Sequence, residues 1–227
     1  MALVERTKLN PGSSEYRDVA DEFNSKNVVK GNKMLEVVSI ERVHNDLLEQ
    51  RFLQKKKQYE RTYGHVRVVK GWHGTKEANV APILRNNFDV SKHGQGVGHR
   101  FGAGVSFSSM ASYASYYCDK GAPTCSMLLV DVLVSNVVEV PENRNPLAVL
   151  HEPPLLPGHG SLRYDTTAKN KERMDVFVKF DDDAYLPTHV VHFQRGSRAA
   201  GVAASTKADL ALLLELLKSF GWHENGF

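Results

Sequence analysis

The chain has 227 residues, 41% hydrophobic and 24% charged, so it is long and apolar enough to bury the core of one globular domain. Its net charge of +3 is mild, its N-terminal segment carries charges at Glu5 and Arg6 where a secretion signal would be apolar, and no stretch reaches the length of a membrane span. The two cysteines, Cys118 and Cys125, are too few for a disulfide framework, so we expect an intracellular protein of the nucleus or cytoplasm with no membrane partner.

The first 34 residues are polar and predict an N-terminal lead-in that packs on the body of the domain. Within it, Tyr16 to Phe23 is typical of a single helical segment. Leu35 to Val43 then alternates as a strand does. Asn45 is suited to cap a helix, apolar residues recur at helical spacing after it, and Gly64 ends the pattern.

Basic side chains gather on this predicted helix, namely Arg51, Lys55, Lys56, Lys57 and Arg61. One interpretation is a solvated helix face whose long side chains cover apolar surface, and the other is a nucleic-acid site. Because no aromatic residues alternate with the basic ones, we favour the solvated face over a nucleic-acid partner, without excluding that partner.

The rest of the chain predicts short strands with few helices. The predicted strands are Val66–Lys70, Met127–Val134, Val137–Val140, Val176–Phe180 and His189–Phe193. Glu77 to Asn86 is typical of a short helix that Pro82 starts or interrupts, whereas the glycine-rich segment 92–104 and the proline-rich segment 141–160 predict loops. After Gln194 a linker leads to a leucine-rich helix, 209–220, which either docks on the domain or binds a partner. We expect an α+β fold with a split antiparallel β-sheet.

Two glycine-rich motifs stand out in this pattern. Gly71-Trp72-His73-Gly74-Thr75 places an imidazole between glycines at the end of a strand. Phe101-Gly102-Ala103-Gly104-Val105-Ser106-Phe107 opens into a segment rich in hydroxyl groups and tyrosine. Glycines there let the backbone approach a planar ligand that a Cβ would hold off. Together the motifs resemble the NAD-binding core of the poly- and mono-ADP-ribosyltransferase (PARP) family.

The resemblance extends from about Leu35 to Phe193 and follows the family's order of elements. Asp165-Thr166-Thr167 resembles the approach to the last strand pair, and Leu186-Pro187 falls between those strands. Within the family the chain is most similar to mono-ADP-ribosyltransferases that often follow macrodomains or WWE modules. The resemblance divides the chain into a lead-in (1–34), a catalytic domain (35–194) and a linker with a C-terminal helix (195–227).

The resemblance implies NAD+ as the substrate and gives four residues a role in binding it. His73 would hydrogen-bond the ribose on the adenosine side, and it is the expected catalytic residue. The backbone of Gly74 would pair with the nicotinamide carboxamide. Thr75 would add a hydroxyl beside NAD+, and Tyr117 would stack on the nicotinamide ring.

Taken alone, these residue types have more ordinary interpretations. His73 would be a histidine that satisfies backbone groups in a buried turn, and Tyr113, Tyr116 and Tyr117 would be packing residues. The loop histidines have no ligand-like spacing, so we expect them at the surface and expect no metal site. They are His93, His99, His151 and His159.

Two positions, one within the second motif and one after it, depart from the family pattern. Ser106, which we still expect to contact NAD+, stands where most members have a tyrosine, so the pocket loses an aromatic wall. Ala114 replaces a serine that donates to the carboxamide, and Ser112 or Ser115 are the candidates to compensate.

A third departure concerns polymer formation. Val176 stands where polymer-forming members have a glutamate that binds the nicotinamide ribose, and Asp175 should project from the opposite face of the strand. The leading hypothesis is therefore transfer of a single ADP-ribose to a protein acceptor with release of nicotinamide. The alternatives are a PARP-like pseudoenzyme that acts as a protein-interaction module, and hydrolysis of NAD+ without transfer.

Overall fold

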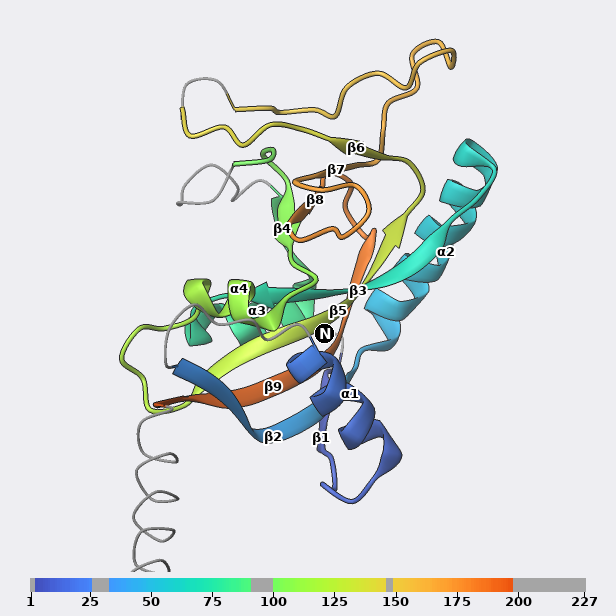
Figure 1. Cartoon of the computed structure of the whole chain (residues 1–227). Helices are drawn as coiled ribbons and strands as arrows, with labels where there is room; N and C mark the ends of the chain where they lie inside the picture. Colours follow the sequence, from blue (N-terminus) through green and yellow to red (C-terminus); the bar gives the residue numbers. More distant parts are fainter. Residues whose placement is uncertain (1–2, 26–32, 91–99, 146–148, 198–227) are drawn as a thin grey trace, which may run out of the picture.

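The computed structural model describes residues 3–25, 33–90, 100–145 and 149–197 (Figure 1), which form two sheets. The larger sheet is antiparallel and has the order β1-β2-β9-β5-β3. Its strands are β1 (Glu5–Lys8), β2 (Lys33–His44), β3 (Arg67–Gly74), β5 (Cys125–Val134) and β9 (Tyr185–Ser197). The smaller sheet has the order β4-β8-β7-β6 and is antiparallel except for the β6–β7 pair. Its strands are β4 (Val105–Phe107), β6 (Val137–Glu139), β7 (Thr166–Ala168) and β8 (Phe177–Lys179). This is the expected α+β fold, with one parallel pair added.

The helices are short apart from one, and α1, α2 and α3 lie where the sequence predicts them, whereas no helix is predicted at α4. They are α1 (Ser14–Ser25), α2 (Asp46–Tyr63), α3 (Glu77–Asn86) and α4 (Ala111–Ala114), the last followed by the 3-10 turn η2 (Ser115–Tyr117). Asn45 caps α2 by accepting the backbone N–H of Leu48, and Gly64 ends it in the left-handed conformation with φ 75°. Pro82 lies inside α3 and does not start it.

Helices cover both faces of the larger sheet, so β5, which lies between β9 and β3, is buried on both sides. On one face α1 brings Phe23 within 5.4 Å of the Trp72 ring, measured between ring centroids, and α4 packs on the same side. On the other face α2 and α3 cover a second cluster that includes Leu128 and Val130 of β5. A strand buried on both faces reads as a continuous apolar run, which explains the pattern from 127 to 134.

The last strand is longer than the sequence predicts, because β9 continues through Leu186 and Pro187 where we expected a break. Proline lacks the N–H that a central strand needs. Here the pairing of β9 with β2 begins only at His189, and the register with β5 shifts between Leu129 and Val130. At Pro187, β9 therefore has a partner strand on one side only, namely β5, and the missing N–H does not interrupt the strand.

A buried ion pair joins the smaller sheet to the connection that precedes it. Lys179 of β8 and Asp165 are both fully buried, with 2.5 Å between Nζ and Oδ2, and Asp165 also accepts the backbone N–H of Ser135. The ammonium group lies 4.9 Å from the ring centroid of Tyr59, which ties α2 to this pair. Burial lowers the pKa of Lys179, and the nearby Asp165 carboxylate acts against that shift.

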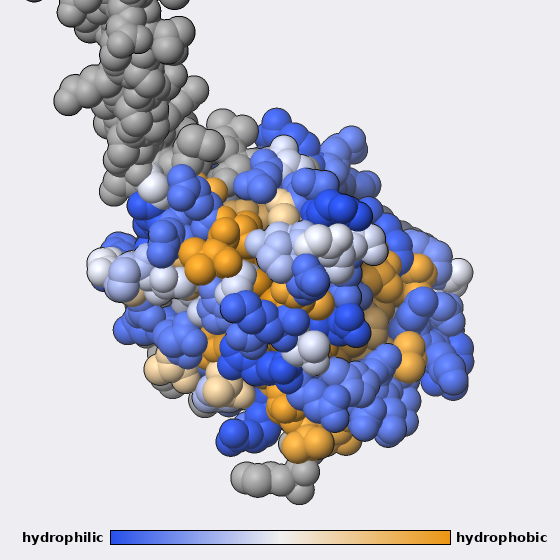
Figure 2. Space-filling model, turned by 90° about the horizontal axis from the view of Figure 1, so that it is seen from below, coloured by the Kyte–Doolittle hydropathy of each residue, from blue (hydrophilic) through white to orange (hydrophobic). Residues whose placement is uncertain are grey.

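The surface has mixed polarity. Seen from below, polar side chains dominate and apolar ones form separate groups (Figure 2). Lys57 and Arg61 of the basic helix face are exposed, as are His151 and His159, which agrees with the predicted surface positions. Within the described ranges, no helix combines the length and the apolar character that crossing a membrane requires. The predicted leucine-rich helix, His93 and His99 lie outside the described residues.

Candidate active site

His73 lies near the end of β3 and is held on three sides. Its Nδ1 is 3.0 Å from the carbonyl oxygen of Ser106, and its ring packs edge-on against Phe88 and Phe107 at centroid distances of 4.7 and 5.9 Å. Because a carbonyl only accepts, Nδ1 carries the proton in this contact. In the neutral imidazole Nε2 is then an acceptor, which suits a ribose hydroxyl.

Gly74 has no room for any side chain. A Cβ there would lie 1.8 Å from the carbonyl oxygen of Ala114 and 3.3 Å from Sγ of Cys118. The backbone of β3 is therefore packed directly against α4, as a site that presents backbone groups requires. The Cys118 thiol donates to the carbonyl of Ser126 at 3.2 Å, and burial raises its pKa to about 12. The Thr75 hydroxyl accepts from Asn79 at 3.0 Å.

Arg195 of β9 holds the turn that carries Tyr117. Its Nη2 donates to the carbonyl of Ser115 at 2.7 Å and its Nη1 to the carbonyl of Asp119 at 3.0 Å. The Asp119 carboxylate in turn accepts the backbone N–H of Glu77, the first residue of α3, at 2.8 Å. The segment around Tyr117 and the turn after Gly74 are thus fixed by the same network. Tyr117 itself is 39% exposed.

The face of the smaller sheet nearest this turn is apolar where the family has its glutamate. Ser106 of β4 lies directly opposite Val178 of β8, so Val176 falls on the same face two residues away. Val176 is 4% exposed and packs in a cluster with Phe101 and Val178. Asp175 is directed elsewhere and pairs with Arg173 at 3.1 Å. The expected alternation of faces therefore holds at this point.

A cavity of about 630 Å³ opens beside His73. Thr75 and Asn79 line it on the side of His73, and Arg51 of α2 and Asp182 also contribute to its wall. Its size suits a ligand of small to moderate size.

The predicted site residues thus fall into two neighbouring groups. His73 and Thr75 line the cavity, whereas Gly74, Ser106 and Tyr117 do not. Ser106 contacts His73 through its carbonyl, and the close approach of Gly74 to α4 places the Tyr117 turn next to it. The roles of these residues in binding NAD+ stay predictions.

Of the two serines proposed to compensate for Ala114, Ser115 uses its hydroxyl within its own turn. The hydroxyl of Ser115 donates to the carbonyl of Ser112 at 2.8 Å, inside the helical turn. Ser112 is buried at 8% exposure.

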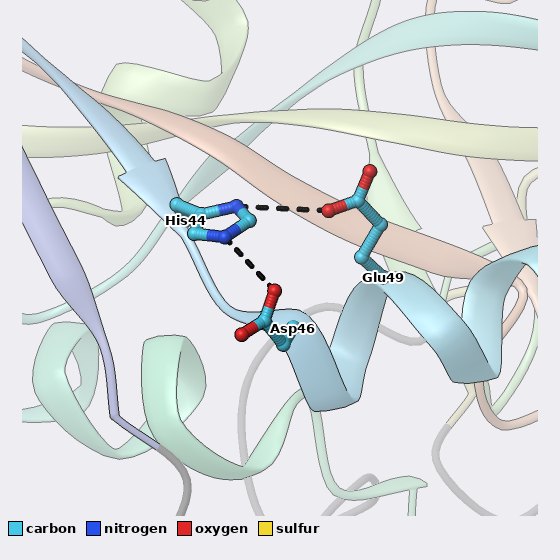
Figure 3. Close-up of side chains that lie close together, drawn as sticks. All are labelled: His44, Asp46 and Glu49. Atoms are coloured by element: carbon cyan, nitrogen blue, oxygen red, sulfur yellow. Dashed lines mark ion pairs between the residues drawn. The ribbon is translucent and has the colours of Figure 1, made fainter.

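One group of side chains in the described part of the chain has atoms placed as metal ligands could be, and it is remote in sequence from His73. It comprises His44, Asp46 and Glu49, whose ligand atoms lie within 4.8 Å of one another (Figure 3). The imidazole of His44 contacts both carboxylates, with Nε2 at 3.0 Å from Asp46 and Nδ1 at 3.6 Å from Glu49. All three residues are exposed, and both carboxylates lie in the first turn of α2, where they favour the helix dipole. We assign these contacts to helix stability.

Sequence reasoning missed several residues that shape the site. Phe88, which packs on the His73 ring, follows Asn87 at the end of α3, and Arg195 lies beyond the last recognised landmark. Asp119 sits in a polar turn with no motif. A phenylalanine after a helix and an arginine near a strand end are too common to predict a contact across the fold.

Comparisons with known proteins agree with this architecture. The family model of the poly(ADP-ribose) polymerase catalytic domain matches residues 13–198. The chain is 29% identical over 185 residues to the mouse protein mono-ADP-ribosyltransferase PARP10 and 27% identical over 196 residues to human protein mono-ADP-ribosyltransferase PARP12. These matches cover 81% and 86% of the chain but only 19% and 26% of the relatives. A probable poly(ADP-ribose) polymerase of Dictyostelium discoideum is 30% identical over 138 residues, covering 57% of the chain and 39% of that relative. The chain therefore belongs to the poly(ADP-ribose) polymerase catalytic domain family of ADP-ribosyltransferases, which use NAD+ as their substrate.

Proposed function

We propose that this chain transfers a single ADP-ribose from NAD+ to a protein acceptor and releases nicotinamide. The observation that carries the proposal is His73, whose Nδ1 is held by the carbonyl of Ser106 at the edge of a cavity of about 630 Å³. Gly74, packed against α4 with no space for a Cβ, supports it. We further propose that the protein works inside the cell, in keeping with two cysteines that are buried and free.

The proposed reaction depends more on the positioning of NAD+ than on a general acid or base. Loss of nicotinamide from NAD+ proceeds through an oxocarbenium-like transition state, because the ribose carbon develops positive charge as the glycosidic bond breaks. His73 would fix the ribose on the adenosine side, and the backbone of Gly74 would hold the carboxamide of the leaving group. Fixing both ends of NAD+ in a desolvated site supplies much of the barrier reduction without a dedicated base.

Transfer of one unit is favoured over polymer formation by the residue at the glutamate position. Val176 is buried among Phe101 and Val178, and Asp175 is paired with Arg173. No carboxylate of this strand is therefore aimed at the position from which a growing ribose hydroxyl would be activated. Two of the three relatives carry the name of mono-ADP-ribosyltransferases, in line with this proposal.

The test is automodification and trans-modification with biotinylated NAD+, comparing the wild type with His73→Ala. We expect label on protein, nicotinamide in the supernatant and discrete products instead of a ladder, all lost in the variant. A ladder of long polymers would refute single transfer. Release of nicotinamide without labelled protein would instead indicate hydrolysis of NAD+.

A second candidate function is a PARP-like pseudoenzyme that serves as a protein-interaction module. It is favoured by Ser106 and Ala114, which remove an aromatic wall and a hydroxyl from the nicotinamide side, and by the use of the Ser115 hydroxyl within its own turn. Wild type and His73→Ala that both lack label and nicotinamide release with every acceptor tested would support this function.

A further inference from the structure

Tyr113 lies between the Val176 cluster of the smaller sheet and Tyr117, two parts of the site at which the chain departs from the family pattern or is predicted to hold nicotinamide. It is the third residue of the four-residue helix α4 and is half-buried. On one side it packs against the cluster that contains Val176 and Val178. On the other side its hydroxyl lies 3.3 Å from the hydroxyl of Tyr117, with ring centroids 5.9 Å apart and an interplanar angle of 55°.

This position matters because of what surrounds it. Val176 stands at the glutamate position, and Ser106 lies on the same face of the sheet as Val178, its partner across β4 and β8. Tyr117 is the predicted stacking residue. A phenol that touches the Val176 cluster and hydrogen-bonds Tyr117 therefore lies where the nicotinamide half of NAD+ would be held. Tyr116, the neighbour on the same turn, is 62% exposed and makes neither contact in the described structure.

We propose that Tyr113 is a substrate-contacting residue that binds the nicotinamide-ribose half of NAD+, its ring and hydroxyl replacing the aromatic wall absent at Ser106. This inference rests on the proposed function, because it assigns a further residue to the same site.

The chemistry of the phenol also limits its role. Burial raises the pKa of Tyr113, and its hydrogen bond to Tyr117 acts in the same direction, so it stays protonated at neutral pH. A neutral phenol donates a hydrogen bond to a ribose hydroxyl but does not remove its proton. Tyr113 therefore strengthens binding of NAD+ without restoring the activation that polymer formation requires.

The experiment compares Tyr113→Phe and Tyr113→Ala with the matched control Tyr116→Phe. Each protein is titrated with NAD+, with nicotinamide mononucleotide and with AMP, so that the two halves of NAD+ are probed separately. Loss of the hydroxyl in Tyr113→Phe should weaken NAD+ and nicotinamide mononucleotide about five- to tenfold, the usual effect of one hydrogen bond to a ligand. Tyr113→Ala should weaken both further, and AMP binding and the Tyr116→Phe control should be unchanged.

A second readout separates contact with the substrate from a purely structural role. KM for NAD+ should rise in Tyr113→Phe while the melting temperature stays at the wild-type value, because the ring and its packing remain. Unchanged affinity for nicotinamide mononucleotide in both Tyr113 variants would overturn the inference, as would equal weakening of AMP. If the Tyr113 variants give one of these results while the wild type binds NAD+ and His73→Ala does not, only the role of Tyr113 is rejected and the proposed function stands. If the wild type binds no NAD+ at all, the proposed function fails as well.

Discussion

The packing around Gly74 allows a quantitative prediction for Gly74→Ala. The added Cβ would lie 1.8 Å from the carbonyl oxygen of Ala114, whereas ordinary contacts begin at 3.4 Å, so β3 and α4 must separate by about 1.6 Å. Overpacking of this kind costs about 1–3 kcal/mol, which lowers the melting temperature of a chain of this size by about 2–12 °C. A misplacement of about 1 Å at a reacting centre reduces the rate on the order of 100-fold.

The assay pairs thermal unfolding with incorporation of label from biotinylated NAD+, using Gly12→Ala as the control. A Cβ at Gly12 meets only the side chain of Asn10 at 3.4 Å, in an exposed turn. We expect Gly12→Ala to match the wild type in both measurements and Gly74→Ala to lose stability and nearly all label. If Gly74→Ala kept the wild-type melting temperature and activity, the argument from close packing of β3 against α4 would be wrong.

Two further predictions concern buried ionisable groups. Lys179→Ala leaves Asp165 buried without its cation, so urea unfolding should show that the free energy of unfolding falls by about 3–5 kcal/mol. The control Lys70→Ala breaks a partly exposed pair with Asp131 and should cost less than about 1 kcal/mol, so equal losses in the two variants would contradict this reasoning. Burial lowers the pKa of His189 below its usual 6.5, although Glu15 opposes the shift, so the unfolded chain takes up the proton first. Stability should therefore fall as the pH drops below about 6.5, and His189→Gln should flatten the dependence of the urea midpoint on pH in that range; an unchanged slope would show that other groups cause it.

Local signals in the sequence predict α1, α2 and α3, but they miss α4 and predict the strands less completely. Asn45 and Gly64 mark the two ends of α2 because capping depends only on neighbouring backbone groups. The break expected at Leu186-Pro187 is absent because the register shift and the missing β2 partner are properties of the sheet. The parallel pairing of β6 with β7 is likewise decided by the fold, since two strands of three residues carry no signal for direction.

In the candidate site, too, local patterns predict some features, whereas contacts between distant elements are not predictable from the sequence. The motif from Gly71 to Thr75 predicts where the backbone comes closest to its neighbours, and the clash at Gly74 is the physical reason for the glycine. Alternation of strand faces correctly separates Val176 from Asp175. Tyr113 was expected to be a packing residue because aromatics at helical spacing usually face a core. Its contact with Tyr117 depends on how α4 meets η2, which no local pattern specifies.

The central claim is that His73 anchors NAD+ for transfer to protein. Isothermal titration of the wild type and of His73→Ala with NAD+ tests it most directly, provided that the same samples are then analysed for covalent ADP-ribose by mass spectrometry. We predict that the wild type binds NAD+ and gains single ADP-ribose units on itself or an added protein, and that His73→Ala does neither at the same NAD+ concentration. Binding and modification that are equal in the two proteins would contradict this account.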